Sequence, residues 1–179
     1  MNAFRRALTA FLLAGLWVAA PVAAAPPERV LVFTKTAKFR HDAIPVAVTT
    51  LQRLVVDEGM AADHTEDARV FTPENLARYR GVVFASTTGD VLEDAQQAAL
   101  EAFVRKGGGF IGVHAAADTE YDWPWYGQLV GAYFQNHPPG LQSTQVQPEK
   151  DGKPVGPRWP ITDELYNYSA NPRGQVQVI

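Results

Sequence analysis

Short apolar runs alternate with helical segments along much of this 179-residue chain. Residues 29–34, 81–86 and 110–113 are apolar runs of strand length, and 60–65 is a weaker candidate. Apolar periodicity and capping residues predict helices over 43–58 (with Asp42 as N-cap), 72–79, 93–106 and 123–130. This order requires parallel strands with helices on both faces of the sheet. The sequence therefore predicts an α/β fold: a flavodoxin-like, doubly wound and mostly parallel sheet.

The run 110–113 is the strand most informative about function. It is predicted to be buried, because it is uniformly apolar and follows a glycine triplet that ends a helix. Directly after it stand a histidine, carboxylates and aromatic rings: His114, Asp118, Glu120, Asp122, Trp123, Trp125 and Tyr126. Ligands of open α/β sheets bind beyond the carboxyl ends of the strands. We therefore expect a functional site here; the alternative is a structural histidine followed by a loop held by packed tryptophans.

The N-terminus has the three parts of a secretory signal peptide. Arg5 and Arg6 precede an apolar run over 7–20, and small residues follow it. The run is short for a membrane span, so we expect residues 1–24 to be cleaved off after Ala24, leaving no stable membrane anchor. An uncleaved N-terminal anchor is the alternative. Export would make the protein periplasmic or secreted.

Composition narrows the classes of function. Removal of residues 1–24 would change the formal charge from −3 to −5, and no basic run remains, which argues against a nucleic-acid partner. The chain has no cysteine, so a cysteine nucleophile and a thiolate metal site are excluded. Residues 25–179 have the length of one domain with a core of its own.

Four ordered motifs resemble the ThuA-like family, named for trehalose utilisation: VLVFTKTAKFRHDAIP, TTGDVL, GGGFIGVHAAADTEYDWPWYGQLVGAYFQNHP and ITDELYNYSANPR. The resemblance begins near Arg29 and runs to the end of the chain. It implies the fold of class I glutamine amidotransferases, in which the tight turn after a central strand carries a cysteine nucleophile. His114 stands at that turn here, so amidotransferase chemistry is not implied.

The resemblance also implies a function in carbohydrate metabolism, on a sugar or on an oxidised (keto) derivative of a disaccharide or glucoside. The C-terminal section of the family, with its GRVFYTALGH-like strand, is not found in this sequence. Residues 25–179 are therefore expected to be a C-terminally truncated ThuA-like domain. The last residues, 175–179, have the pattern of a strand.

Histidines are the main catalytic candidates. His41, His114 and His137 lie near predicted strand ends or in the loops beyond them, whereas His64 lies within the weak strand. A histidine takes and gives protons near neutral pH, which suits isomerisation, epimerisation or elimination beside a carbonyl. Each histidine alone is as well explained by a structural hydrogen bond, so the catalytic hypothesis requires them in one pocket.

Carboxylates, basic side chains and aromatic rings complete the predicted site. Asp118 is expected to orient a histidine or to bind sugar hydroxyls, and Glu164 is a catalytic candidate because DELYNY resembles the family motif. An exposed loop acid is the alternative for Glu164. The candidates for substrate binding are Lys35, Arg40, Trp123, Trp125 and Tyr126. The two cations would hold an anionic or carbonyl oxygen, and the rings would form a carbohydrate platform unless they pack in the core.

No local motif supports a metal or phosphate site. HxH and HExxH spacings are absent, and the glycine triplet 107–109 lacks the Gly-Lys-Ser/Thr ending of a phosphate loop. We expect no cofactor and no metal; the alternative is a metal site assembled from His41, His114, His137 and Glu164.

Two functions from different classes are compatible with these residues. The first is an exported sugar-modifying isomerase, lyase or hydrolase that uses histidine acid/base chemistry. The second is a non-catalytic carbohydrate-binding or accessory domain with the aromatic cluster as its working surface. The first requires the histidines in one pocket beside a carboxylate, and the second requires exposed rings in a groove.

Overall fold

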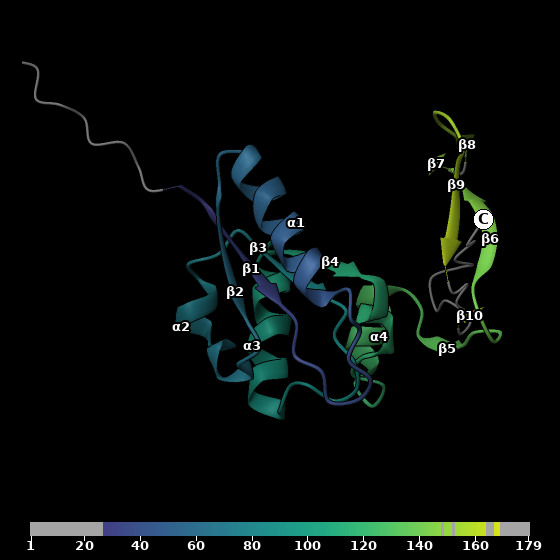
Figure 1. The fold of residues 1–179 in the computed structure, drawn as a ribbon. Coiled ribbons are helices and arrows are strands. Elements are labelled where there is room, and N and C mark those ends of the chain that lie inside the picture. Colours follow the sequence, from purple (N-terminus) through teal and green to yellow (C-terminus); the bar gives the residue numbers. More distant parts are fainter. Residues whose placement is uncertain (1–26, 148, 152, 164–166, 169–179) are drawn as a thin grey trace, which may run out of the picture.

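A central sheet of parallel strands forms the core of the protein (Figure 1). The computed structural model describes residues 27–147, 149–151, 153–163 and 167–168. The sheet strands are β1 (Arg29–Phe33), β2 (Ala61–Thr65), β3 (Gly81–Ala85) and β4 (Gly109–Val113), in the order β2-β1-β3-β4. Each pair of neighbours is parallel. The predicted flavodoxin-like, doubly wound sheet is confirmed, with β1 in its interior.

The helices follow the strands in the predicted order: α1 (Ile44–Asp57), α2 (Pro73–Leu76), α3 (Asp94–Arg105) and α4 (Pro124–Val130), with two short 3-10 helices, η1 (Ala68–Val70) and η2 (His114–Asp118). Thr72 caps α2, because its Oγ1 accepts the Asn75 N–H at 3.2 Å. The prediction of Asp42 as N-cap of α1 is wrong. Ala43 is the N-cap, without a side-chain hydrogen bond, because a turn closed by Ile44 N–H on the His41 carbonyl oxygen moves the helix start past Asp42.

Alternating strand side chains build a separate core on each face of the sheet. The larger cluster lies towards α2, α3 and α4 and contains Phe33 and Phe84, both 0% exposed. The smaller cluster lies under α1 and contains Val32 and Val83. Truncating a buried phenylalanine to alanine costs about 3–5 kcal/mol, so the larger cluster dominates the stability of the sheet. This rigid sheet fixes the loops that leave its carboxyl ends.

β4 is half exposed, which contradicts the prediction of a buried strand. Gly109 and Gly112 are exposed, and Ile111 keeps 57% of its accessible surface. Among the described strands, β4 pairs with β3 on one side and has no partner on the other. α1 packs mainly over β1 and β2 rather than over β4. An apolar run identifies a strand, but it does not tell where in the sheet that strand lies.

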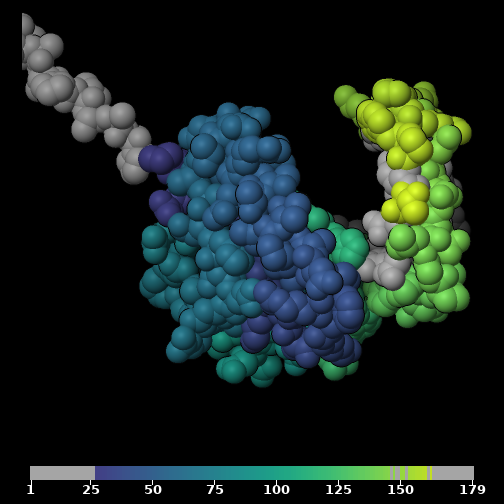
Figure 2. Space-filling view, in the orientation of Figure 1, coloured from purple at the N-terminus to yellow at the C-terminus, as the bar shows by residue number. Residues whose placement is uncertain are grey.

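Beyond α4, short antiparallel strands replace the parallel sheet. β5 (Phe134–Asn136) pairs with β10 (Asn167–Tyr168), β6 (Gln142–Val146) pairs with β9 (Trp159–Asp163), and β7 (Glu149–Lys150) pairs with β8 (Lys153–Pro154). The β6–β9 hairpin stands beside the main body (Figure 1), and open space separates the two over much of its length (Figure 2).

The predicted strand over 175–179 and the predicted signal peptide over 1–24 lie outside the described residues. Within the described part of the chain, no helix has the length and apolar character needed to cross a bilayer.

Candidate functional site

His114 occupies a sharp backbone turn at the carboxyl end of β4. It is the first residue of η2, and its φ of +55° lies in the left-handed region. Non-glycine residues adopt this region rarely and usually at functional or turn positions. His114 is also exposed. The tight turn expected in the GVHAA sequence is therefore present, and it presents the imidazole at the end of the sheet.

His41 approaches His114 from the loop between β1 and α1. The centroids of the two imidazole rings are 4.7 Å apart and their planes are at 82°, an edge-to-face arrangement. β3 lies between β1 and β4 in the sheet, so the two loops meet beyond the end of β3. Two of the three candidate histidines thus come together at the edge where parallel strands place ligands.

Phe39 extends this row of rings. Its ring centroid is 4.8 Å from that of His41, at an interplanar angle of 84°, and 68% of its surface is exposed. Phe39 is not among the predicted site residues, because a phenylalanine carries no acid/base or hydrogen-bonding group. Its signal in the sequence is its position, two residues before His41 in a mostly polar loop.

Asp118 is held by Tyr121 at the end of η2. The Tyr121 hydroxyl lies 2.6 Å from Asp118 Oδ1 and 2.7 Å from the Phe134 carbonyl oxygen. Partial burial, together with the bond to Asp118, raises the pKa of the Tyr121 phenol, which therefore stays protonated as a donor. Tyr121 ties η2 to β5, the strand that leads to His137. The role of Asp118 in orienting a histidine stays a prediction.

Glu120 fixes the loop after η2 from the interior. It is 1% exposed and has a φ of +55°. Its Oε1 accepts the N–H groups of Val91 and Leu92, each at 2.8 Å, and its Oε2 accepts the side-chain amide of Gln97 at 2.6 Å. Burial raises the pKa of the Glu120 carboxyl above its ordinary value of 4.5. Glu120 therefore joins the loop after η2 to the loop between β3 and α3, a structural role that sequence reasoning did not assign.

Both basic candidates have partners within the protein. Lys35 Nζ donates to the Val91 carbonyl oxygen at 2.8 Å. Arg40 binds Glu66 with two hydrogen bonds, Nη2 to Oε1 at 2.7 Å and Nη1 to Oε2 at 3.1 Å, and these bonds lower the pKa of the Glu66 carboxyl. The Arg40 side chain is 51% exposed, so it keeps surface that a ligand can reach. Lys35 serves to hold the loop before α3.

The predicted carbohydrate platform is contradicted at Tyr126. Tyr126 is 0% exposed, and its hydroxyl donates to the Ala116 carbonyl oxygen at 2.8 Å. A fully buried ring has no face to offer a sugar, so Tyr126 is a core residue. The rings of Trp123 and Trp125 lie 4.9 Å apart and are partly buried against the same core. Packing is thus the main fate of this aromatic cluster, because α4 turns its rings towards the sheet.

His137 directly follows β5, a strand that contacts η2. Its Nδ1 lies 2.9 Å from the Pro138 carbonyl oxygen. Glu164 lies outside the described residues, so its predicted place in the site is untested. Within the described ranges, no three His, Asp or Glu side chains converge as the ligands of a metal ion would.

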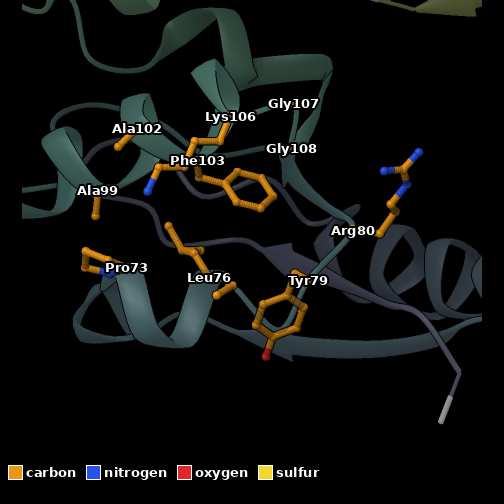
Figure 3. A pocket seen from close by; sticks show the side chains of 11 residues that line it. Pro73, Leu76, Tyr79, Arg80, Ala99, Ala102, Phe103, Lys106, Gly107 and Gly108 are labelled. Atoms are coloured by element: carbon orange, nitrogen blue, oxygen red, sulfur yellow. The ribbon is translucent and has the colours of Figure 1, made fainter. Parts of the chain in front are cut away.

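Two pockets lie at opposite ends of β4. One, of about 330 Å³, opens beside His114 and is lined in part by Leu129. The other, of about 260 Å³, lies between α2 and α3, where Leu76 and Phe103 line it (Figure 3). Its lining includes Gly108, which directly precedes β4, so this second pocket is at the amino ends of the strands. Of the two paired histidines, His114 lines the first pocket and His41 does not.

Together, fold and site define the class of protein: a flavodoxin-like α/β domain with an imidazole on the tight turn after its fourth parallel strand. The family can be stated as well. A family model described as ThuA, trehalose utilisation, matches residues 29–179, and the chain belongs to this family.

Two crystal structures of ThuA-like proteins share the fold. One, from Bacteroides uniformis, has 23% sequence identity and a TM-score of 0.66, and the match covers 86% of this chain and 66% of that one. The other, from Parabacteroides merdae, has 20% identity and a TM-score of 0.52, with 79% and 49% covered. This chain thus spans less than two thirds of the length of either protein. No protein of curated function matches the sequence.

Proposed function

We propose that this protein is exported and acts in carbohydrate metabolism, on a sugar or keto-sugar, by acid/base chemistry at His41 and His114. The observation that carries the proposal is the contact between the two imidazole rings, whose centroids lie 4.7 Å apart. Two further observations support the proposal. A pocket of about 330 Å³ opens beside His114, and the matching family model is described as trehalose utilisation.

Two imidazoles at this spacing can divide a proton transfer between them. In a keto-sugar, one ring takes the proton from the carbon next to the carbonyl, and the electron pair of the broken C–H bond forms the double bond of an enol. The other ring donates a proton to the carbonyl oxygen. Return of a proton to a different carbon or face completes an isomerisation or epimerisation, and loss of a leaving group from the neighbouring carbon completes an elimination.

Arg40 fits this chemistry as a binding residue. It is next to His41 in the sequence, its guanidinium is permanently charged, and half of its side chain is exposed. In the proposed complex it holds an oxygen of the substrate while Glu66 keeps its planar group in place. His137 and Glu164 stay candidates for a further proton carrier or carboxylate.

The test replaces the histidines one at a time. Asparagine suits His114, because it tolerates a left-handed backbone while removing titration. For His114→Asn and His41→Asn we expect turnover of a keto-glucoside to fall by about 10²–10⁴-fold, with unchanged circular dichroism. His64→Asn, on β2, is the matched control for removal of an imidazole, because His64 bonds to Thr34 Oγ1 at 2.8 Å and is not one of the proposed proton carriers. Unchanged turnover in both folded site variants would refute the proposal.

A non-catalytic carbohydrate-binding domain is the competing function. It would be established if the wild-type protein bound a keto-glucoside or disaccharide in calorimetry and did not convert it over a long incubation. Full burial of Tyr126 and partial burial of Trp123 and Trp125 against the core weaken the main sequence argument for that function. We therefore place the enzyme first.

Export is the remaining part of the proposal, and it rests on the composition of residues 1–24. The expected mature N-terminus is Ala25, which intact-mass spectrometry of protein from a native-like host would reveal. Recovery of a chain that still begins at Met1 in the membrane fraction would contradict cleavage.

A further inference from the structure

We propose that Phe39 determines specificity in the His41/His114 site by binding an aromatic group attached to the sugar of the substrate. The inference rests on the proposed function, since it takes the histidine pair as the place where the sugar reacts. Its structural basis is the row formed by the rings of Phe39, His41 and His114. Successive centroids in this row are 4.8 and 4.7 Å apart.

Exposure alone does not distinguish Phe39, because single apolar side chains are common on protein surfaces. Its position does. Phe39 is 68% exposed, and its ring packs edge-to-face with the ring of His41. An apolar group bound there would be held next to any sugar that contacts the two imidazoles.

The backbone under Phe39 is fixed in place by Thr88. Thr88 Oγ1 donates to the Phe39 carbonyl oxygen at 2.7 Å and accepts the Lys38 N–H at 3.3 Å. Lys38 is itself anchored, since its Nζ lies 5.2 Å from the ring centroid of Tyr121. Gly89 permits this close approach, because a Cβ there would lie 2.8 Å from Lys38 Cγ. A fixed backbone leaves fewer degrees of freedom to lose when a ligand binds, which favours a binding role for Phe39.

The chemistry of the side chain selects the kind of group that binds. Phenylalanine has no atom that can donate or accept a hydrogen bond, unlike the tyrosine and tryptophan rings that combine a flat face with a polar edge. It gains nothing from sugar hydroxyls but packs well against an apolar ring. The row therefore fits a glycoside whose sugar lies over the histidines and whose aromatic aglycone lies over Phe39.

The experiment compares two probes, the keto derivatives of p-nitrophenyl glucoside and methyl glucoside. Both Kd, by calorimetry, and KM and kcat are measured for the wild type, Phe39→Leu and Phe39→Ala. For Phe39→Ala we expect Kd and KM for the aryl probe to rise by about three- to tenfold, with values for the methyl probe and kcat for both probes unchanged. Phe39→Leu should lie between. Leu54→Ala is the matched control, because Leu54 is 51% exposed near the far end of α1.

Several results would overturn the inference. An equal change for both probes, or a fall in kcat with KM unchanged, would mean that Phe39 only orients His41. Failure of the wild type to bind the aryl probe would also refute it. If the wild type binds both probes and converts neither, the proposed function fails, but the ratio of the two Kd values still decides the role of Phe39.

Discussion

Replacement of Glu120 by alanine should destabilise the protein more than a charge-removing change at the same position. Glu120 is 1% exposed, and its Oε1 is the acceptor for the N–H groups of both Val91 and Leu92. Alanine leaves these two buried donors without that acceptor, at a cost of about 1–3 kcal/mol each. Val91 and Leu92 also line a surface pocket, so water can reach part of the space that Glu120→Ala would leave. We therefore expect the free energy of unfolding to fall by about 2–4 kcal/mol in total.

The variant Glu120→Gln separates the effect of the acceptor oxygen from the effect of the negative charge, because it keeps the oxygen and removes the charge. Its Oε1 still accepts both backbone N–H groups, while its amide nitrogen faces Gln97, which can turn its own amide round to offer an oxygen. The expected loss for Glu120→Gln is therefore about 0–1 kcal/mol.

Urea unfolding followed by circular dichroism measures both variants. In thermal unfolding, Glu120→Ala should lower Tm by roughly 5–15 °C, since each kcal/mol shifts Tm by about 2–4 °C at this chain length. The reasoning is refuted if Glu120→Ala lies within about 0.5 kcal/mol of the wild type, a typical surface effect. It is equally refuted if Glu120→Gln lowers stability as much as Glu120→Ala does, because the negative charge would then matter more than the hydrogen bonds that Oε1 accepts.

Two further predictions concern pH and the aromatic cluster. Burial raises the pKa of Glu120 above 4.5, so the folded state holds this proton more tightly than the unfolded chain does. The stability of the wild type relative to Glu120→Gln should therefore fall as pH rises from about 4.5 through the raised pKa. Urea titrations across that pH range would measure this difference. A flat difference would contradict the shift. Trp125→Ala should cost about 2–4 kcal/mol of stability, because the ring packs against the core, and should leave the Kd for a keto-glucoside unchanged. A weakened Kd at unchanged Tm would restore the carbohydrate platform.

The fold could be predicted because its information is local. Strand-length apolar runs, the Thr72 cap and the helix over 93–106 each appear in a single stretch of sequence, and their order dictates a parallel sheet. The order of elements places His41 and His114 beyond the carboxyl ends of β1 and β4, but their meeting depends on the strand order in the sheet, which puts only β3 between these two strands.

What could not be predicted depends on tertiary packing. Tyr126 faces the core and not solvent because of the rotation of α4 against the sheet, which the sequence WPWY does not encode by itself. Ile111 is exposed because of the lateral position of β4, whereas a short apolar run favours burial. Phe39 is exposed, and the hydrogen bond from Thr88 that holds its backbone joins residues 49 positions apart, which sequence reasoning does not reveal.

The left-handed backbone at His114 has a consequence for reading natural variation at this position. A φ of +55° admits glycine, asparagine, aspartate and histidine at low cost, and it strongly disfavours β-branched residues. Selection for the turn alone would therefore allow a small set of residue types at position 114, and histidine already belongs to that set. Exchange among these four residues would show that the turn is kept for the fold, whereas a histidine that changes only together with position 41 would show that the ring pair is kept for its chemistry.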